Sequence, residues 1–175
     1  MRIIESKVLY EGKLRGVRET IELAEGKRCV HETIEHPGAV VILPVEADGS
    51  FVFIEQYRHS IRGTLLELPA GTLERGEEPS VCAQRELMEE VGMACRDLVS
   101  LGSILPAPGF CNEIQHLFCA RDLYPQQATP DEDEIITKVC LSRLELVEAI
   151  RSGRLVDGKS LALLMRASMQ GVIHL

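Results

Sequence analysis

The stretch from residue 71 to residue 93 constrains this chain more than any other, because its glycines, acids and arginine stand at helical intervals. Pro79 has the fixed φ that suits the first position of a helix, and Gly92 is a natural C-terminal breaker. No other glycine or proline lies between them, so we predict a helix there. One face of this helix is apolar and holds Ala83, Leu87 and Val91.

Three glutamates form an acidic ridge on the flank of the predicted helix: Glu86, Glu89 and Glu90. Glu86 and Glu90 are like charges four residues apart, which costs an isolated helix roughly 0.2–0.5 kcal/mol. The negative C-terminal end of the helix adds to that cost. A solvated acidic face is the simplest alternative, but the crowding favours a cation, and Mg²⁺ accepts oxygen ligands from one or two carboxylates. We expect Arg85 to pair with Glu77 and so hold the preceding loop against the helix.

This pattern resembles the Nudix box, in which a glycine, a glutamate and the run R-E-apolar-X-E-E-X-G-apolar stand at fixed spacing. The matching residues are Gly71, Glu77, Arg85, Glu86, Leu87, Glu89, Glu90, Gly92 and Met93. A chance match is expected in on the order of one in a million chains of this length. The resemblance implies a Nudix fold and a hydrolase of nucleoside diphosphates linked to another moiety.

The same resemblance implies that the helix holds Mg²⁺, with Mn²⁺ as a possible substitute. Glu86 and Glu90 are then the main metal ligands, and the backbone carbonyl of Ala70 is a further ligand. Glu89 is either a third ligand or a hydrogen-bond partner of metal-bound water, with a solvated side chain as the alternative. We expect both Arg85 and Glu89 to be catalytic residues.

Similarity to the ADP-ribose pyrophosphatase branch of that family extends over residues 36 to about 140. It rests on HPGAVVILPV at 36–45, EQYRH at 55–59, ELPAG at 67–71 and APGFCNE, whose Pro108 lies 15 residues after Met93. The resemblance implies that substrate contacts Pro108, Gly109 and Phe110. Arg58 also qualifies on physical grounds, because a guanidinium at a strand end can grip phosphate oxygens bidentately. A salt bridge at the surface is the alternative for Arg58.

The acidic loop at residues 131–134 and the N-terminal strands supply the remaining candidates. Members of the branch use a glutamate on a mobile loop to orient or deprotonate the attacking water, and Glu134 is the first choice here, with Glu132 second. A solvated loop is the alternative for this acidic run. Members of the branch often place an arginine and a glutamate on the third strand, where they contact substrate across a domain-swapped dimer. Glu32 fits this pattern, but Val30 stands two residues before it, and the nearest arginine is Arg28.

Composition excludes several classes of function. The net charge of −8 and the pI near 5.2 argue against a nucleic-acid partner. No signal peptide and no run of 18 apolar residues is visible, so we expect a cytoplasmic protein without a membrane partner. The six cysteines form no C-x-x-C pair and are expected to be reduced apolar fillers. The chain has no tryptophan, so adenine stacking must fall to Tyr, Phe or aliphatic side chains.

The pattern of apolar residues predicts a mixed α/β fold. Residues 2–10, 17–23 and 29–36 indicate an N-terminal antiparallel sheet. We expect residues 1–35 to mediate dimerisation, either with or without a swap of these strands between the two copies. Residues 36–175 form the expected Nudix domain, a mixed β-sheet between helices. Asp48-Gly49 predicts a hairpin turn between two buried strands. Helices are expected at 145–151 and 160–170.

The leading hypothesis is therefore Mg²⁺-dependent hydrolysis of the pyrophosphate bond of ADP-ribose to AMP and ribose 5-phosphate by a homodimer. One alternative is another nucleotide sugar or a dinucleotide, such as GDP-mannose or NADH. A second alternative, from a different class, is a non-catalytic nucleotide sensor. The intact ridge of Glu86, Glu89 and Glu90 argues against a sensor, which has no need to keep the three acids together.

Overall fold

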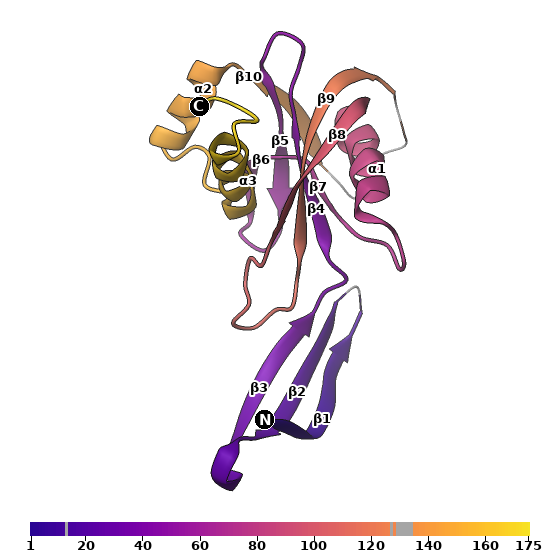
Figure 1. Ribbon diagram of the computed structural model, residues 1–175, viewed down its shortest axis with the longest axis vertical. Helices are drawn as coiled ribbons and strands as arrows, with labels where there is room; N and C mark the ends of the chain where they lie inside the picture. The colour runs from indigo at the N-terminus through magenta and orange to yellow at the C-terminus, as the bar shows by residue number, and fades with distance from the viewer. Residues whose placement is uncertain (13, 127, 129–134) are drawn as a thin grey trace.

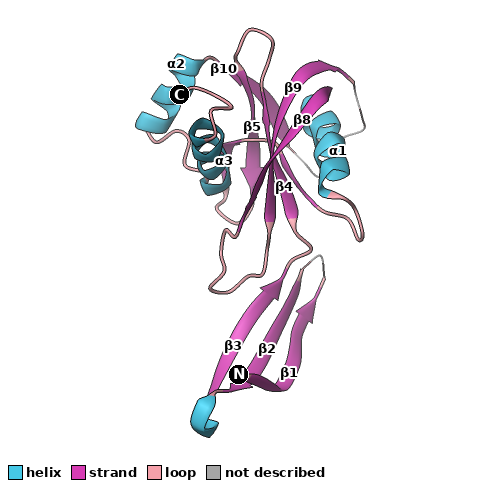
Figure 2. Ribbon diagram, viewed as in Figure 1, coloured by secondary structure: helices cyan, strands magenta, loops and turns pink. Residues whose placement is uncertain are grey.

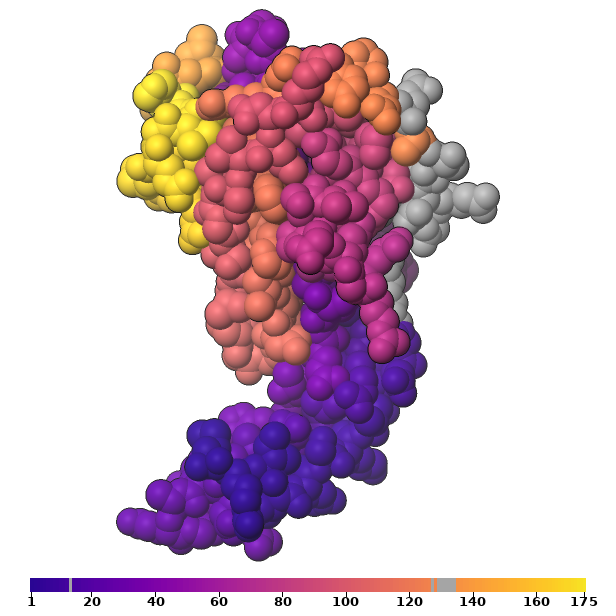
Figure 3. Space-filling view, turned by 45° about the vertical axis from the view of Figure 1, so that its right-hand side comes forward, coloured from indigo at the N-terminus to yellow at the C-terminus, as the bar shows by residue number. Residues whose placement is uncertain are grey.

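The computed structural model describes residues 1–12, 14–126, 128 and 135–175, and the chain forms a helix-flanked body with a three-stranded sheet extending from one end (Figure 1). The N-terminal sheet has the order β1-β2-β3 and is antiparallel throughout, as the sequence predicts. Its strands are β1 (Arg2–Glu11), β2 (Arg15–Glu22) and β3 (Arg28–Glu35), with a 3₁₀ turn, η1 (Ala24–Gly26), before β3. The space-filling view shows how far this sheet extends from the body (Figure 3).

The body contains two sheets rather than one continuous sheet (Figure 2). The first sheet has the order β7-β4-β9-β8 and consists of β4 (Ala39–Pro44), β7 (Ala70–Thr72), β8 (Met93–Ile104) and β9 (Gln115–Pro125). The second has the order β10-β5-β6 and consists of β5 (Phe51–Arg58), β6 (Gly63–Glu67) and β10 (Ile136–Leu141). Strands β4 and β9 are parallel and every other named pair in the two sheets is antiparallel, so the body has the predicted mixed character.

The hairpin prediction at Asp48-Gly49 is only half correct. The turn forms, with the Glu46 N–H donating to the Ser50 carbonyl at 2.9 Å and Gly49 at a positive φ of 84°. The strands on either side are joined by a single bridge, between Val45 and Phe51, and then enter different sheets. Strand β4 pairs instead with β9, and β5 pairs with β10.

Three helices cover the body: α1 (Pro79–Val91), α2 (Arg143–Arg151) and α3 (Gly158–Met169). Strand β4 is buried along its whole length because its two faces meet different helices. Val40 and Ile42 pack in a cluster with Leu87 of α1, whereas Val41 and Leu43 pack in a cluster with residues of α2 and α3. The predicted arrangement of strands between helices is therefore confirmed.

Capping residues explain where the helices begin and end. Helix α1 begins at Pro79 and ends at Gly92, which adopts the left-handed conformation, as predicted. Helix α2 begins two residues earlier than expected because Ser142 caps it and forms a capping box with Glu145. Helix α3 likewise begins at Gly158 because the side chain of Asp157 accepts a hydrogen bond from the Ser160 N–H.

All six cysteines are free thiols, as expected, but only three of them are buried. Cys82, Cys95 and Cys119 are buried, whereas Cys140 is exposed, so the expectation that all six are apolar fillers is wrong for Cys140. Burial raises the pKa of the Cys82 thiol to about 12, which keeps it protonated at neutral pH. Among the residues described, no helix is long and apolar enough to cross a membrane.

Candidate active site

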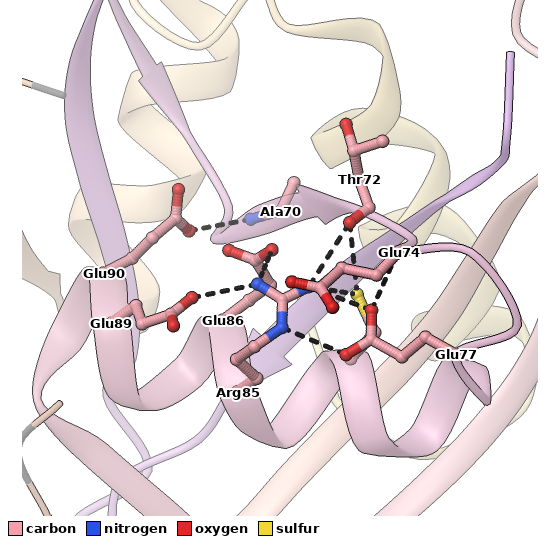
Figure 4. Close-up of polar contacts among 9 residues, drawn as sticks. Ala70, Thr72, Glu74, Glu77, Arg85, Glu86, Glu89 and Glu90 are labelled. Carbon is pink, nitrogen blue, oxygen red and sulfur yellow. Dashed lines mark hydrogen bonds and ion pairs between the residues drawn. The ribbon is translucent and has the colours of Figure 1, made fainter. Parts of the chain in front are cut away.

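Strand β7 lies directly against the acidic face of α1, and Gly71 makes this approach possible. A Cβ added to Gly71 would lie 1.8 Å from both Cδ and Oε1 of Glu86, so no larger residue fits without displacing that carboxylate. One residue earlier, the Ala70 N–H donates to Oε2 of Glu90 at 2.9 Å (Figure 4). The missing side chain at Gly71 therefore creates the space in which the Glu86 carboxylate lies.

Arg85 is the centre of the hydrogen-bond network on this face of α1 (Figure 4). Its Nε and Nη2 donate to the two carboxylate oxygens of Glu77, both at 3.0 Å, which confirms the predicted pair. Its Nη1 donates to Glu86 Oε1 at 2.6 Å and to Glu89 Oε2 at 2.9 Å. Arg85 Nη2 also reaches the Thr72 carbonyl at 3.3 Å, so one side chain holds the loop, the strand and the ridge together.

The charges of this network are unbalanced. Three carboxylates, from Glu77, Glu86 and Glu89, share the single guanidinium of Arg85. Hydrogen bonds from Arg85 lower the pKa of Glu77 to about 2, so this carboxylate is ionised across the physiological range. The same bonds raise the pKa of Arg85. The excess of negative charge remains for a cation to neutralise.

The residues fit a hard divalent cation held through few protein ligands. The available donors are carboxylate oxygens, which Mg²⁺ prefers, and the space beside Gly71 admits a carboxylate that a Cβ would displace. In the described part of the chain, His, Cys, Asp and Glu form no ready-made group of three metal ligands. Glu86 is turned toward Arg85, and Glu90 toward the Ala70 N–H. Mg²⁺ commonly takes one or two carboxylates and completes its shell with waters and phosphate oxygens, which suits Glu86 and Glu90.

A cavity of about 340 Å³ opens next to this network. All three residues of β7, Ala70, Gly71 and Thr72, form part of the cavity wall. The cavity therefore borders the strand that contacts the acidic ridge. Further lining comes from the end of β5, from the start of β9 with the residues just before it, and from the N-terminal end of α3 with its cap. These supply Arg58, Glu113, Gln115, Asp157 and Lys159. Gln115 is buried and, among the described residues, its Oε1 has no hydrogen-bond partner.

The structure places Arg58 in the wall of this cavity and gives it a partner that sequence reasoning missed. Arg58 donates from Nε to Glu67 Oε1 at 2.7 Å and from Nη2 to Glu67 Oε2 at 2.8 Å. Lys159 also donates to Glu67 Oε2. The signal for Glu67 was present, because it is the one charged residue in the apolar run from Leu65 to Leu68. Lys159 carried no signal, since it lies far along the chain from Glu67.

The remaining predicted site residues lie elsewhere. Glu32 pairs with Arg18 on the neighbouring strand, and Arg28 is exposed at the start of β3. Phe110 is 58% exposed and, with Glu32, lines a separate hollow of about 310 Å³ at the N-terminal sheet. The turn at 108–110, which carries Pro108 and Gly109, meets the end of β3 through a hydrogen bond from the Ile34 N–H to the Phe110 carbonyl at 2.7 Å.

The single chain thus brings Arg85, Glu86, Glu89, Glu90 and Ala70 together, with Arg58 in the adjoining wall. The residues of the N-terminal sheet line a different hollow. The predicted water-activating residues, Glu132 and Glu134, lie outside the described residues.

Comparison with known proteins gives consistent matches. A methanol dehydrogenase activator of Bacillus methanolicus is 33% identical over 172 residues, which is 97% of this chain and 93% of that protein. An ADP-ribose pyrophosphatase of Bacillus subtilis is 33% identical over 162 residues, covering 91% of this chain and 88% of that protein. The crystal structure of an ADP compounds hydrolase superposes with a TM-score of 0.85 at 22% identity, covering 97% of this chain and 92% of the other, and so shares the fold.

The family model described as NUDIX domain matches residues 35–164, a span that runs from the end of β3 into α3 and includes the network around Arg85. Most of the chain therefore fits one family model, and relatives a third identical align along nearly its whole length. This chain belongs to the Nudix domain family.

Proposed function

We propose that this protein hydrolyses the pyrophosphate bond of a nucleoside diphosphate sugar in a Mg²⁺-dependent reaction. ADP-ribose is the first candidate substrate, with AMP and ribose 5-phosphate as products. The observation that carries the proposal is the intact ridge of Glu86, Glu89 and Glu90, organised by Arg85 beside a cavity large enough for part of a nucleotide. The similarity to an ADP-ribose pyrophosphatase supports the choice of substrate.

The acidic ridge supplies the metal site in this proposal. Glu86, Glu90 and the carbonyl of Ala70 would hold Mg²⁺, and Glu89 would be a third ligand or a partner of bound water. When bound, Mg²⁺ neutralises phosphate oxygens and lowers the pKa of a bound water. Arg85 keeps Glu86 and Glu89 at fixed positions, because both carboxylates accept hydrogen bonds from its Nη1.

Residues outside the ridge bind the substrate and move the proton. Arg58 would grip a phosphate oxygen from the cavity wall, where its guanidinium already lies. Pro108, Gly109 and Phe110 would contact the nucleotide. Glu134, or in second place Glu132, would accept the proton of the attacking water, as a carboxylate can when it comes within hydrogen-bond reach.

We also propose that the protein is a cytoplasmic homodimer in which residues 1–35 reach the partner's site. The N-terminal sheet exposes the apolar side chains of Ile3, Val8, Leu9, Tyr10 and Val30, which a second copy could cover. In this proposed dimer, Glu32 and Arg28 of one copy would contact the substrate bound in the partner's cavity. Light scattering at micromolar concentration tests the idea, and an active monomer would rule it out.

A product assay tests the proposed function. Purified protein is incubated with Mg²⁺ and, separately, with ADP-ribose, GDP-mannose, NADH, diadenosine polyphosphates and nucleoside triphosphates, and products are separated by chromatography. We expect AMP and ribose 5-phosphate from ADP-ribose, no products in EDTA, and at least ~10²-fold slower turnover by Glu86→Gln. If GDP-mannose or NADH were hydrolysed faster than ADP-ribose, that compound would replace ADP-ribose as the proposed substrate. Binding without hydrolysis of any compound would favour a sensor.

A further inference from the structure

A buried carboxylate between two cations forms one wall of the cavity. The side chain of Glu67 is about 1% exposed and lies at the end of β6. Arg58, at the end of β5, makes a two-bond contact with it at 2.7 and 2.8 Å. Lys159, in the first turn of α3, donates to the same Oε2 atom that accepts from Arg58 Nη2. The neighbouring strands β5 and β6 thus meet α3, which is distant in sequence, at one carboxylate.

A buried carboxylate paired with two cations contributes little to the stability of a fold. The presence of this cluster therefore needs another explanation. Removing charges from water is costly, and buried ion pairs can often be replaced by apolar residues without loss of stability. Apolar replacements were available, since the flanking Leu66 and Leu68 are both buried in the core. The charged cluster also lines the cavity rather than the core, because Arg58, Glu67 and Lys159 all contribute to its wall.

The contacts of Arg58 leave part of its guanidinium available to a ligand. Nε and Nη2 are held by Glu67, whereas Nη1 has no hydrogen-bond partner among the described residues. A guanidinium carries five N–H donors in a rigid plane, so fixing one edge also fixes the direction of the remaining donors. The side-chain entropy that Arg58 would otherwise lose on binding is then lost before the ligand arrives.

We propose that Glu67 is a positioning residue for substrate binding, which holds the Arg58 guanidinium so that its free donors meet a phosphate oxygen of a nucleotide in the cavity, and that Lys159 fixes Glu67. The inference rests on the proposed function, in which Arg58 binds a substrate phosphate. It gives Glu67 and Lys159 a role in substrate binding that requires no contact between them and the substrate.

The charge state of Glu67 agrees with this role. Burial alone would raise its pKa, but the hydrogen bonds and positive charges of Arg58 and Lys159 outweigh burial, and the net shift is downward. Glu67 is therefore ionised at neutral pH and accepts hydrogen bonds with both oxygens. A neutral glutamine could accept on one side only, so it could not reproduce the two-bond contact with Arg58.

Lys159 is itself held by the start of α3. Its Nζ lies 3.0 Å from Asp157 Oδ2, and Asp157 caps the helix by accepting from the Ser160 N–H at 3.0 Å. The Ser160 hydroxyl accepts a hydrogen bond from the Leu68 N–H at 2.7 Å, directly after Glu67. The first turn of α3 therefore contacts the end of β6 and the residue after it at two points. Lys159 binds the side chain of Glu67, and Ser160 binds the backbone N–H of Leu68.

A double-mutant cycle tests whether Glu67 acts through Arg58. The dissociation constant for ADP-ribose is measured by calorimetry in EDTA, where no hydrolysis occurs, for the wild type, Glu67→Gln, Arg58→Met and the double variant. Each single change should weaken binding roughly 10- to 100-fold, as expected for lost hydrogen bonds to charged groups. The double variant should bind no more than about twofold weaker than Arg58→Met alone, because the two residues act as one unit.

The matched control is Glu55→Gln. Glu55 lies on strand β5 and also pairs with an arginine, Arg154 in the connection between α2 and α3, at 2.9 Å. It does not line the cavity, so its loss should leave binding unchanged. Independent, additive effects of Glu67→Gln and Arg58→Met would overturn the inference. So would an equal loss of affinity in Glu55→Gln.

A second cycle covers the case in which Glu67→Gln does not fold. Lys159→Met replaces it, with Lys159→Arg as the rescue and Lys138→Met as the control, since Lys138 pairs with Glu46 at 3.9 Å and lies outside the cavity. We expect Lys159→Met to weaken binding at least about threefold, Lys159→Arg to restore most of it, and the effect to disappear in the Arg58→Met background. Failure of rescue, or an effect that persists without Arg58, would overturn the role of Lys159.

The same titrations separate this inference from the proposed substrate. If the wild type binds GDP-mannose or NADH but not ADP-ribose, and the coupling between Glu67 and Arg58 is retained, the positioning role stands and the ADP-ribose assignment fails. If ADP-ribose binds but the cycle is additive, the assignment stands and the positioning role fails. If none of the three nucleotides binds in EDTA, the positioning role fails, and the proposed function fails as well only if the assay with Mg²⁺ yields no product.

Discussion

Replacing Gly71 with alanine tests the close approach of β7 to the acidic ridge. The new Cβ would lie 1.8 Å from Cδ and Oε1 of Glu86, whereas ordinary van der Waals contact begins at 3.4 Å. Gly71 does not have a left-handed φ, so the substitution adds no backbone strain and its effect is purely steric. Either the Glu86 carboxylate moves by about 1.6 Å, or β7 and α1 separate by a comparable distance.

The expected loss is large for catalysis and small for stability. A displacement of about 1 Å at a catalytic group can cost roughly 10²-fold in rate, so kcat should fall at least ~100-fold, equivalent to about 2.7 kcal/mol of transition-state stabilisation. The clashing atoms of Glu86 belong to its side chain and not to the backbone, so a change of side-chain conformation relieves the clash. The free energy of unfolding should therefore fall by only about 1 kcal/mol, which lowers Tm by roughly 2–4 °C.

The assay is AMP release from ADP-ribose at saturating Mg²⁺, with thermal unfolding followed by circular dichroism. Gly63→Ala is the control, because Gly63 is also a strand glycine without a left-handed φ, and its nearest neighbour would lie 3.8 Å from the added Cβ. It should retain wild-type turnover. Near wild-type turnover by Gly71→Ala would refute the claim that the position of the Glu86 carboxylate governs catalysis.

Three further predictions concern the ridge, its supporting acid and the acidic loop. Glu90→Gln should lower turnover at least ~10²-fold with little change in Tm, and undiminished turnover at saturating Mg²⁺ would contradict its role as a metal ligand. Because the pKa of Glu77 falls from 4.5 to about 2 on folding, its pairing with Arg85 stabilises the fold above pH 4.5, and this contribution is lost as pH falls toward 2. Urea unfolding should thus be less acid-sensitive in Glu77→Gln, and identical pH profiles would exclude this contribution. Glu134→Gln should lower kcat with little change in KM while Glu132→Gln has little effect, and the opposite pattern would move the role by two residues.

Features determined by residues close together in the sequence could be predicted from the sequence. The bounds of α1 followed from Pro79 and Gly92, and the contact between Arg85 and Glu77 followed from the closeness of the preceding loop to the helix. Both predictions are confirmed. The first turns of α2 and α3 were missed, although the capping residues Ser142 and Asp157 are visible in the sequence. Reading those caps would have moved both helix starts to their observed positions.

Features that depend on distant partners were not predictable in the same way. The Asp48-Gly49 signal specifies a turn but does not say which sheet each flanking strand joins, because that is decided by pairing with β9 and β10. The cluster at Glu67 is a similar case. A lone acid in an apolar run indicates a buried partner, but nothing in the spacing identifies Lys159 of α3 as one of its partners.

The parallel pairing of β4 with β9 has a consequence for how the molecule folds. Ala39 pairs with Gln115, so all of β5 to β8 and helix α1 lie in the connection between the two strands. Closing so long a loop is entropically costly, and parallel pairings of this kind form slowly. On the ribosome, β4 must wait for β9 to emerge before its second edge is paired. We therefore expect the four-stranded sheet of β7, β4, β9 and β8 to be completed late in folding.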